Sequence, residues 1–160
     1  MSLDLPDEAA TLALGAALAR ALHPGLTIRL EGELGSGKTT LVRGVLRGLG
    51  WTGKVKSPTF TFVELYVISN LKLHHFDFYR LEQAEEYLDA GLDEYFQSDA
   101  VCLVEWPDRA GEYLAPGDLR VSLSPLGEGR RAVLAALGDK GQACLSALRH
   151  CLPLSIAAPS

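Results

Sequence analysis

The segment Gly32–Thr39 has the spacing G-x-x-x-x-G-K-T, which is typical of a loop that binds nucleotide phosphates. Its glycines let the backbone wrap closely, so that successive amide groups point at phosphate oxygens. Lys38 is placed to reach the β- and γ-phosphates, and the Thr39 hydroxyl is placed to bind Mg²⁺. A glycine-rich turn without a ligand is the alternative, but here a predicted strand precedes the loop and a predicted helix follows it. The helix adds its N-terminal dipole at the same place, so the sequence predicts a nucleotide site.

Two acidic residues are candidates for the other side of a magnesium site. Glu105 directly follows the apolar run 100–104, and Asp77 lies late in the run 71–78. A carboxylate at the end of a buried strand can hold Mg²⁺, directly or through a water, or orient the water that attacks a phosphate. A solvated carboxylate is the ordinary alternative for each residue. The sequence leaves open which of the two positions the water and whether Asp77 touches the metal.

The segment Asp108–Gly111 imitates the D-x-x-G motif of GTPases. However, Glu105 holds the place directly after the strand, and Pro107 separates it from Asp108. No N-K-x-D or T-K-x-D segment that could read guanine follows. The sequence therefore favours ATP over GTP.

Two further segments carry polar side chains close to these acids in sequence. His74 and His75 are neighbours on a predicted strand, so their side chains point to opposite faces and do not readily share a metal ion. We predict a packed or hydrogen-bonded His75 instead. Ser57-Pro58-Thr59 lies where a switch segment would, between the helix after the phosphate loop and the next strand. The hydroxyl groups of Thr59 and Thr61 are candidates to sense the γ-phosphate.

The elements that must position these residues alternate between strands and helices. The segment Asp4–Asp7 predicts a helix start, with a capping aspartate and a proline in the first turn. Further helices are expected after the phosphate loop and over 81–90 and 143–148. Strands are predicted over 26–30, 59–67, 71–78, 100–104, 119–123 and 132–137. We therefore expect an α/β protein with three layers, in which helices cover both faces of a mostly parallel central sheet with added antiparallel strands.

Composition narrows the class of protein and its compartment. The formal net charge of −5 disfavours binding of nucleic acid through the overall field of the molecule. No apolar run reaches the length of about 18 residues that a membrane-spanning helix needs. The three cysteines have unrelated spacings, and the acidic N-terminus lacks the features of a signal peptide. We expect one cytoplasmic domain over residues 1–160, with a loose tail after about residue 150.

Four segments together resemble one family closely. In order and spacing they resemble the bacterial TsaE (YjeE) family, the ATPase component of threonylcarbamoyladenosine biosynthesis on tRNA. Residues 6–11 also resemble the first helix of that family, so the resemblance covers roughly residues 5–135. The phosphate loop is shared with many families, whereas the H-F-D-x-Y-R-L and E-W segments are far more particular. The four segments are Gly32–Thr40, Val55–Thr61, His75–Leu81 and Cys102–Trp106.

The resemblance implies a P-loop NTPase fold that binds ATP and Mg²⁺ and hydrolyses ATP weakly when alone. It implies stimulation by the partner proteins TsaB and TsaD, which make the modification on adenosine 37 of tRNAs that read ANN codons. On this basis the protein meets tRNA only indirectly, through the complex, and meets no membrane. The resemblance also implies that hydrolysis resets the complex between turnovers, without transfer of the threonylcarbamoyl group by this chain.

Residue by residue, the resemblance assigns magnesium binding to Thr39 and Glu105. It assigns catalysis to Glu105, Asp77 and Lys38. The nucleotide-binding positions that it implies are Thr11, Gly35, Ser36, Gly37, Lys38, Thr39, Thr40, Trp106 and Arg130.

Arginine positions are the least defined part of this assignment. The loop Gly127–Arg131 leaves Arg131 as an alternative to Arg130. No arginine finger is evident in the sequence, which fits slow intrinsic turnover and activation by partners. A P-loop kinase, a nucleotide-gated binding module and a GTPase remain alternative functions, although the arginine-rich lid that such kinases carry is not evident.

Overall fold

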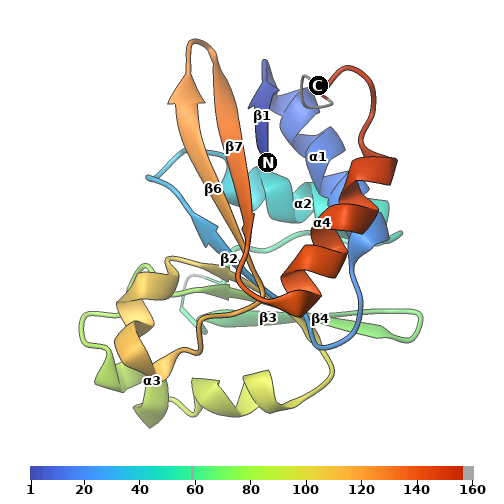
Figure 1. Cartoon of the computed structure of the whole chain (residues 1–160). Coiled ribbons are helices and arrows are strands. Elements are labelled where there is room, and N and C mark those ends of the chain that lie inside the picture. The colour runs from blue at the N-terminus through green and yellow to red at the C-terminus, as the bar shows by residue number, and fades with distance from the viewer. Residues whose placement is uncertain (59, 157–160) are drawn as a thin grey trace.

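The computed structural model describes residues 1–58 and 60–156 (Figure 1). Within this part of the chain, a seven-stranded sheet has the strand order β1-β7-β6-β2-β5-β4-β3. The strands are β1 (Ser2–Leu5), β2 (Thr27–Glu31), β3 (Val63–Ile68), β4 (Leu71–Asp77), β5 (Val101–Glu105), β6 (Leu119–Leu126) and β7 (Gly129–Ala136). The α-helices are α1 (Glu8–Ala21), α2 (Lys38–Gly48), α3 (Glu85–Asp89) and α4 (Asp139–Cys151), and the 3-10 helices are η1 (Leu92–Gln97) and η2 (Pro107–Tyr113).

The centre of the sheet is parallel and its margins are antiparallel. β2 pairs in parallel with both β5 and β6, and β4 pairs in parallel with β5. The antiparallel pairs are β1 with β7, β6 with β7, and β3 with β4. This confirms the expected mostly parallel central sheet with added antiparallel strands.

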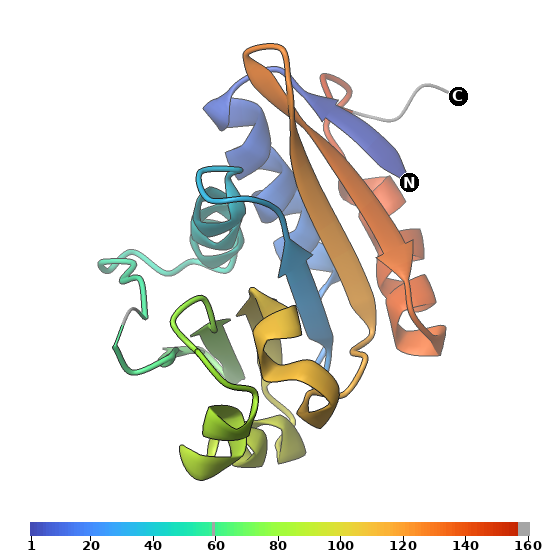
Figure 2. The same cartoon turned by 90° about the vertical axis from the view of Figure 1, so that its left-hand side faces the viewer.

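Helices cover both faces of the sheet, as Figures 1 and 2 show. On one face, α1 packs against α2 and α4, and α4 packs against β6 and β7. On the other face, α3, η1 and η2 enclose a second hydrophobic cluster that includes Phe76, Tyr87 and Val104. β5 serves both layers, because all five of its residues are buried, as in a continuous apolar run between two covered faces. The three-layer architecture is therefore confirmed.

The N-terminus differs from the expectation, because residues 2–5 form a strand before the first helix begins. Leu3 and Leu5 alternate with exposed residues and are buried where β1 pairs with β7. The side chain of Asp7 caps α1 by accepting a hydrogen bond of 2.8 Å from the Ala10 amide. The predicted helix start is therefore confirmed at Asp7, the last residue of the predicted segment. Asp4 and Leu5 belong to β1 instead, and Pro6 precedes the cap, because a four-residue edge strand gives little local signal in the sequence.

Two other predicted elements are shorter than expected. Phe62 has a left-handed backbone (φ 65°), so the chain turns there and β3 begins only at Val63. The helix predicted over 81–90 forms only at α3, and Gly91 (φ 70°) then leads directly into η1. The Glu86 side chain accepts hydrogen bonds from the amides of Glu82 and Gln83, which keeps the preceding residues in a loop.

The C-terminal helix is longer than expected, since α4 runs from Asp139 to Cys151. Beyond it, Ile156 is buried against the main hydrophobic core. The rest of the tail expected to be loose, residues 157–160, lies outside the described residues. None of the described helices is long and apolar enough to cross a membrane.

Candidate nucleotide-binding and catalytic site

A cavity of about 470 Å³ lies at the carboxyl ends of the parallel strands β2, β4 and β5. Ligands of open parallel sheets bind at this end, beyond the last residues of the strands. The lining comes from α1, the phosphate loop, the strand ends and the β6–β7 turn. It consists of Asp7, Glu8, Thr11, Leu34, Gly35, Ser36, Gly37, Lys38, Thr39, Thr40, Ser57, Asp77, Tyr79, Glu105, Trp106, Glu128, Gly129 and Arg130.

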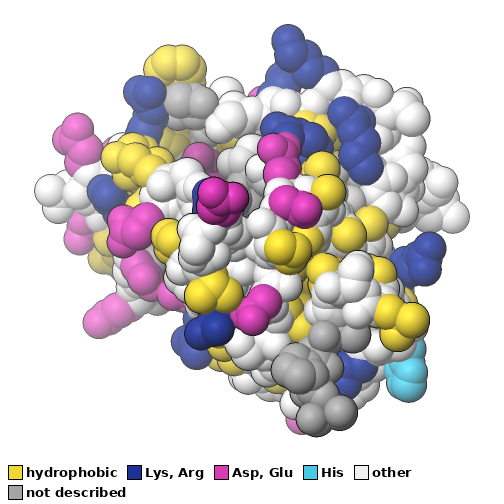
Figure 3. Space-filling model, turned by 90° about the horizontal axis from the view of Figure 1, so that it is seen from above, with side chains coloured by type: hydrophobic (Ala, Val, Ile, Leu, Met, Phe, Trp, Pro, Cys, Tyr) yellow, Lys and Arg dark blue, Asp and Glu magenta, His cyan; other side chains and the backbone are white. Residues whose placement is uncertain are grey.

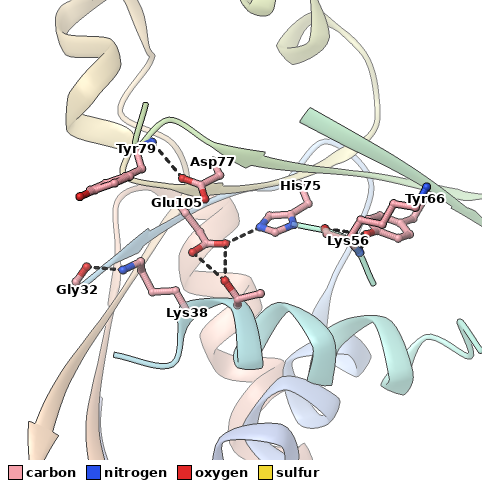
Figure 4. Close-up of polar contacts among 9 residues, drawn as sticks. Gly32, Lys38, Lys56, Tyr66, His75, Asp77, Tyr79 and Glu105 are labelled. Carbon is pink, nitrogen blue, oxygen red and sulfur yellow. Dashed lines mark hydrogen bonds and ion pairs between the residues drawn. The ribbon is translucent and has the colours of Figure 1, made fainter. Parts of the chain in front are cut away.

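The phosphate loop joins β2 to the first residue of α2. Gly35 (φ 75°) and Gly37 (φ 104°) both have left-handed backbones, which only glycine adopts without strain. Lys38 is buried, and its Nζ donates a hydrogen bond to the Gly32 carbonyl (Figure 4). It donates a second one, of 3.0 Å, to the Glu33 carbonyl. Burial lowers the pKa of Lys38, while the carboxylates of Glu105, Asp77 and Glu33 act in the opposite direction. An ammonium group is thus held at the mouth of a loop built for phosphate oxygens.

Glu105 is a buried carboxylate that faces the start of α2. The Thr39 hydroxyl donates to both of its oxygens, at 3.3 Å to Oε1 and 3.2 Å to Oε2. The Nε2 of His75 donates to Oε2 at 2.6 Å, so the prediction of a hydrogen-bonded His75 is confirmed (Figure 4). A hydroxyl and a carboxylate that converge in this way are ligand types that Mg²⁺ prefers. The described residues contain no group of three or more His, Cys, Asp or Glu side chains that could hold a metal ion by themselves.

Asp77 lies beside Glu105, because the two residues are register partners on β4 and β5. Its Oδ1 accepts a hydrogen bond of 3.0 Å from the Tyr79 amide. Burial raises the pKa of Asp77, and the neighbouring Glu105 carboxylate raises it further, while the bond from Tyr79 opposes this shift. Two carboxylates side by side in a cavity are suited to hold a cation or a polarised water between them.

Trp106 follows Glu105 with a left-handed backbone (φ 54°, ψ 49°), which is unusual for a large side chain. Its ring lies 4.6 Å from Lys38 Nζ and 5.0 Å from the Tyr79 ring, measured to ring centroids. The Arg109 guanidinium lies over both rings, at 5.3 Å from Tyr79 and 5.7 Å from Trp106. This aromatic wall closes one side of the cavity above Lys38.

The two arginines at the start of β7 point to different places. Arg130 donates to the carbonyls of Ser36 (2.9 Å) and Gly35 (2.8 Å), and so ties β7 to the phosphate loop. Arg131 instead pairs with Asp4 at 3.2 Å. Of the two alternatives left open by the sequence, only Arg130 lines the cavity.

All residues that the resemblance assigned to catalysis, nucleotide binding and magnesium binding line this cavity, including Thr11 on α1 and Thr40 on α2, whereas Thr61 does not. Ser57 of the expected switch segment also lines it, whereas Thr59 lies outside the described residues. The Thr61 hydroxyl donates to the Val63 carbonyl at 3.0 Å. Asp108 of the GTPase-like segment pairs with Arg29 at 3.0 Å, away from the cavity.

Several lining residues were missed by the sequence reasoning. Tyr79 had a signal, since it is part of the same H-F-D-x-Y-R-L segment as Asp77. Asp7, Glu8 and Glu128 had none, because they reach the cavity through the packing of α1 and of the β6–β7 turn around the phosphate loop.

The chain is similar to known proteins of one family. The family model described as "Threonylcarbamoyl adenosine biosynthesis protein TsaE" matches residues 5–133. The chain is 38% identical over 151 residues to the tRNA threonylcarbamoyladenosine biosynthesis protein TsaE of Haemophilus influenzae, covering 91% of this chain and 96% of that relative. It is 41% identical over 148 residues to the protein of the same name from Bacillus subtilis, covering 91% and 90%.

A solved structure supports the same relationship. The crystal structure of YdiB from Bacillus subtilis superposes with a TM-score of 0.80 at 34% identity, covering 94% of this chain and 95% of that one. The family match spans both the phosphate loop and the Glu105–Trp106 segment. The chain therefore belongs to the TsaE family.

Proposed function

We propose that this protein binds ATP with Mg²⁺ and hydrolyses it in the biosynthesis of threonylcarbamoyladenosine on tRNA. The observation that carries the proposal is the meeting of Lys38, Thr39 and Glu105 in one cavity at the carboxyl end of the sheet. The names of the relatives supply the pathway, and the site supplies the chemistry. We place the protein in the cytoplasm, where free thiols such as its cysteines stay reduced.

The phosphate loop binds the triphosphate in this proposal. We assign the amides of Gly35 and Gly37 and the start of α2 to the phosphate oxygens, and Thr40 extends the same surface. Ser36 also lines the cavity, and its amide donates to the Glu33 carbonyl at 3.0 Å, which shapes the loop. Lys38 exchanges the carbonyls of Gly32 and Glu33 for β- and γ-phosphate oxygens. Charge-assisted bonds of this kind are about twice as strong as neutral ones.

The residues present fit a magnesium ion, because the Thr39 hydroxyl and the Glu105 carboxylate already lie within 3.3 Å of each other. These two residues would hold Mg²⁺, which would neutralise the negative charge that develops on the phosphate groups during hydrolysis. Asp77, next to Glu105, is the residue that we assign to positioning the attacking water. Thr11, Trp106 and Arg130 form the walls of the nucleotide site in this proposal.

Activation by other proteins is part of the proposal. Among the described residues, Arg130 is the one arginine that lines the cavity, and its guanidinium is occupied by loop carbonyls. An arginine finger can raise the rate of hydrolysis about a thousandfold or more. We therefore propose slow hydrolysis alone and stimulation by TsaB and TsaD, with tRNA reached only through these partners.

The test is phosphate release from ATP by the protein alone and with TsaB and TsaD. We expect a slow basal rate that rises when both partners are present and falls about a hundredfold in Glu105→Ala. Glu112→Ala, which removes an exposed carboxylate outside the cavity, is the matched control and should behave as wild type. Transfer of phosphate to an acceptor other than water, without stimulation by active partners, would favour a P-loop kinase instead.

A further inference from the structure

His75 is the most enclosed polar side chain of the site, with 0% of its surface exposed. It lies on β4, on the same side as Asp77, and its Nε2 reaches Glu105 at 2.6 Å (Figure 4). Among the described residues this is the shortest hydrogen bond to the Glu105 carboxylate, since both bonds from Thr39 exceed 3.1 Å. The histidine therefore contacts Glu105 from the side away from solvent.

The contact distinguishes the two oxygens of Glu105. Oε2 accepts from both His75 and Thr39, whereas Oε1 accepts only the longer bond from Thr39. A glutamate has three side-chain torsions, and the neighbouring Asp77 carboxylate repels it. A short bond at Oε2 fixes the orientation of the group and leaves Oε1 directed toward the cavity.

The ring has one nitrogen to spare. The Nδ1 of His75 is buried and has no hydrogen-bond partner among the described residues. A neutral imidazole carries a single N–H, and the partner of that N–H sets the tautomer and the ring orientation. Among the described residues, the side chain of His75 forms a hydrogen bond to Glu105 alone. The polar role of this buried ring is therefore its contact with the Glu105 carboxylate.

We infer that His75 is a positioning residue, which orients Glu105 for Mg²⁺ through the Nε2–Oε2 hydrogen bond. The inference rests on the proposed function, because it presumes that Glu105 binds the metal. Residues that orient a metal ligand in this way contribute about 10- to 100-fold to metal affinity in proteins generally. His75 itself contacts neither nucleotide nor metal in this arrangement.

The chain contains a matched control in the preceding residue. His74 is on the same strand and is also buried, with 7% of its surface exposed, and its Nδ1 also lacks a partner among the described residues. Its ring packs instead on the opposite face of the sheet, 5.1 Å from the Tyr95 ring and 6.0 Å from the Phe76 ring. A general effect of replacing a buried histidine should therefore appear equally in both variants.

The experiment measures the Kd of a fluorescent ATP analogue in EDTA and in saturating Mg²⁺ for wild type, His75→Leu, His75→Gln and His74→Leu. The Mg²⁺-dependent gain is the ratio of the Kd in EDTA to the Kd in saturating Mg²⁺. We expect His75→Leu to keep the wild-type Kd in EDTA and to reduce this gain about tenfold or more. His75→Gln should retain the gain, because the glutamine amide can place an N–H where Nε2 lies. His74→Leu should also retain it.

If His75→Leu does not fold, as judged by thermal unfolding, His75→Asn replaces it. The shorter asparagine amide occupies the region of Nδ1 and does not reach Glu105, so it should lose the gain that glutamine keeps. An unchanged Mg²⁺-dependent gain in the folded variant that lacks the donor overturns the role of His75 alone. Absence of any such gain in wild type overturns the proposed function as well.

Discussion

At the scale of single residues, the site concentrates charge where water is scarce. Only 4% of the surface of Lys38 and 3% of that of Glu105 is exposed to solvent, and Asp77 lies beside Glu105. Charged groups are stable at such depth only when each has a partner. Lys38 has the carbonyls of Gly32 and Glu33, and Glu105 has Thr39 and His75. These pairs hold both charged groups in fixed positions at the cavity.

Replacement of Lys38 tests the phosphate loop directly. We expect Lys38→Ala to weaken ATP binding by about a hundredfold or more, because it removes charged hydrogen bonds to two phosphates. Isothermal titration with ATP and Mg²⁺ measures the loss. Lys54→Ala, at an exposed position outside the cavity, should bind ATP as wild type does. Equal ATP affinities of the two variants would contradict the assignment of this loop as the phosphate-binding site.

Asp77 should make stability depend on pH. Burial is the chief cause that raises its pKa in the folded state above the usual value of 3.8. Between the unfolded and the folded pKa, the folded state binds more protons, so stability falls as pH rises through this window. At neutral pH the ionised carboxylate therefore remains destabilising.

Asp77→Asn removes this charge and keeps the oxygen that accepts the Tyr79 amide. We expect the variant to be more stable than wild type at pH 7 and to lose that advantage as the pH falls from the raised pKa of folded Asp77 toward 3.8. Urea unfolding across this pH range measures the difference. A constant difference at every pH would show that Asp77 does not titrate differently in the two states.

At the scale of elements, the β6–β7 hairpin acts as a brace for the phosphate loop. Arg130, at the start of β7, binds the carbonyls of two loop residues, Gly35 and Ser36. The Ser36 amide donates to the Glu33 carbonyl at 3.0 Å, so the loop is held from both sides of the Gly35–Ser36 peptide. Arg130 therefore helps to fix the conformation of the phosphate loop.

We expect Arg130→Ala to weaken ATP binding about tenfold, since it removes two charged hydrogen bonds that order the loop. Arg131→Ala is the matched control, because the adjacent guanidinium pairs with Asp4 on β1. The Kd values for ATP with Mg²⁺ give the comparison. A greater loss in the Arg131 variant would contradict the brace.

The position of α2 depends on a close contact with α1. A Cβ atom at Gly44 would lie 2.5 Å from the Leu12 carbonyl oxygen, and one at Gly15 would lie 2.6 Å from the Leu41 oxygen. Alanine raises helix propensity by about 1 kcal/mol over glycine in isolation. Overpacking against a backbone, however, costs about 1–3 kcal/mol, so packing should decide the sign.

Gly44→Ala should therefore lower the free energy of unfolding and, because α2 begins at Lys38, weaken nucleotide binding too. Gly138→Ala is the control, since a Cβ there meets no atom within 4 Å. Urea unfolding and ATP affinity are the two measurements. A stabilised Gly44 variant would mean that the helices are not in contact at this point.

Much of this arrangement could be predicted from the sequence, and the exceptions have physical causes. The phosphate loop and the buried apolar run of β5 have strong local sequence signals. Lys38 and Glu105 could therefore be placed together at the carboxyl ends of the central strands. β1 is short and depends on β7 for its pairing. The left-handed Phe62 and the early end of α3 depend on tertiary contacts rather than on local preference. Only the register of β7 shows which of the two arginines, Arg130 or Arg131, lines the cavity.

At the scale of the whole molecule, two hydrophobic cores share one sheet. Cys144 lies in the core under α1, α2 and α4, and Cys102 lies in the core under α3, η1 and η2. The cavity takes residues from elements attached to both cores. On the face seen in Figure 3, acidic, basic and hydrophobic side chains are interspersed, which fits contact with protein partners better than with an RNA backbone.

We propose that residues 1–160 unfold as one cooperative unit, and the cysteines can test this. Burial raises the pKa of the Cys102 thiol to about 12 and that of Cys144 to about 11, so neither should react in the folded state. Cys151, at the end of α4, is partly exposed. We expect Ellman's reagent at pH 8 to modify one thiol of the native protein, and Cys151→Ser to abolish that reaction.

In Cys151→Ser, the two remaining thiols report on the two cores separately. If β5 couples the cores, Cys102 and Cys144 should become reactive at the same urea concentration, and ATP with Mg²⁺ should protect both equally. At a ligand concentration of about 100 times Kd, this protection amounts to about 2.7 kcal/mol. Mass spectrometry of the labelled peptides measures each thiol in the same sample. Earlier labelling of Cys102 would show that the layer of α3, η1 and η2 opens on its own, and the proposal of a single cooperative unit would then fail.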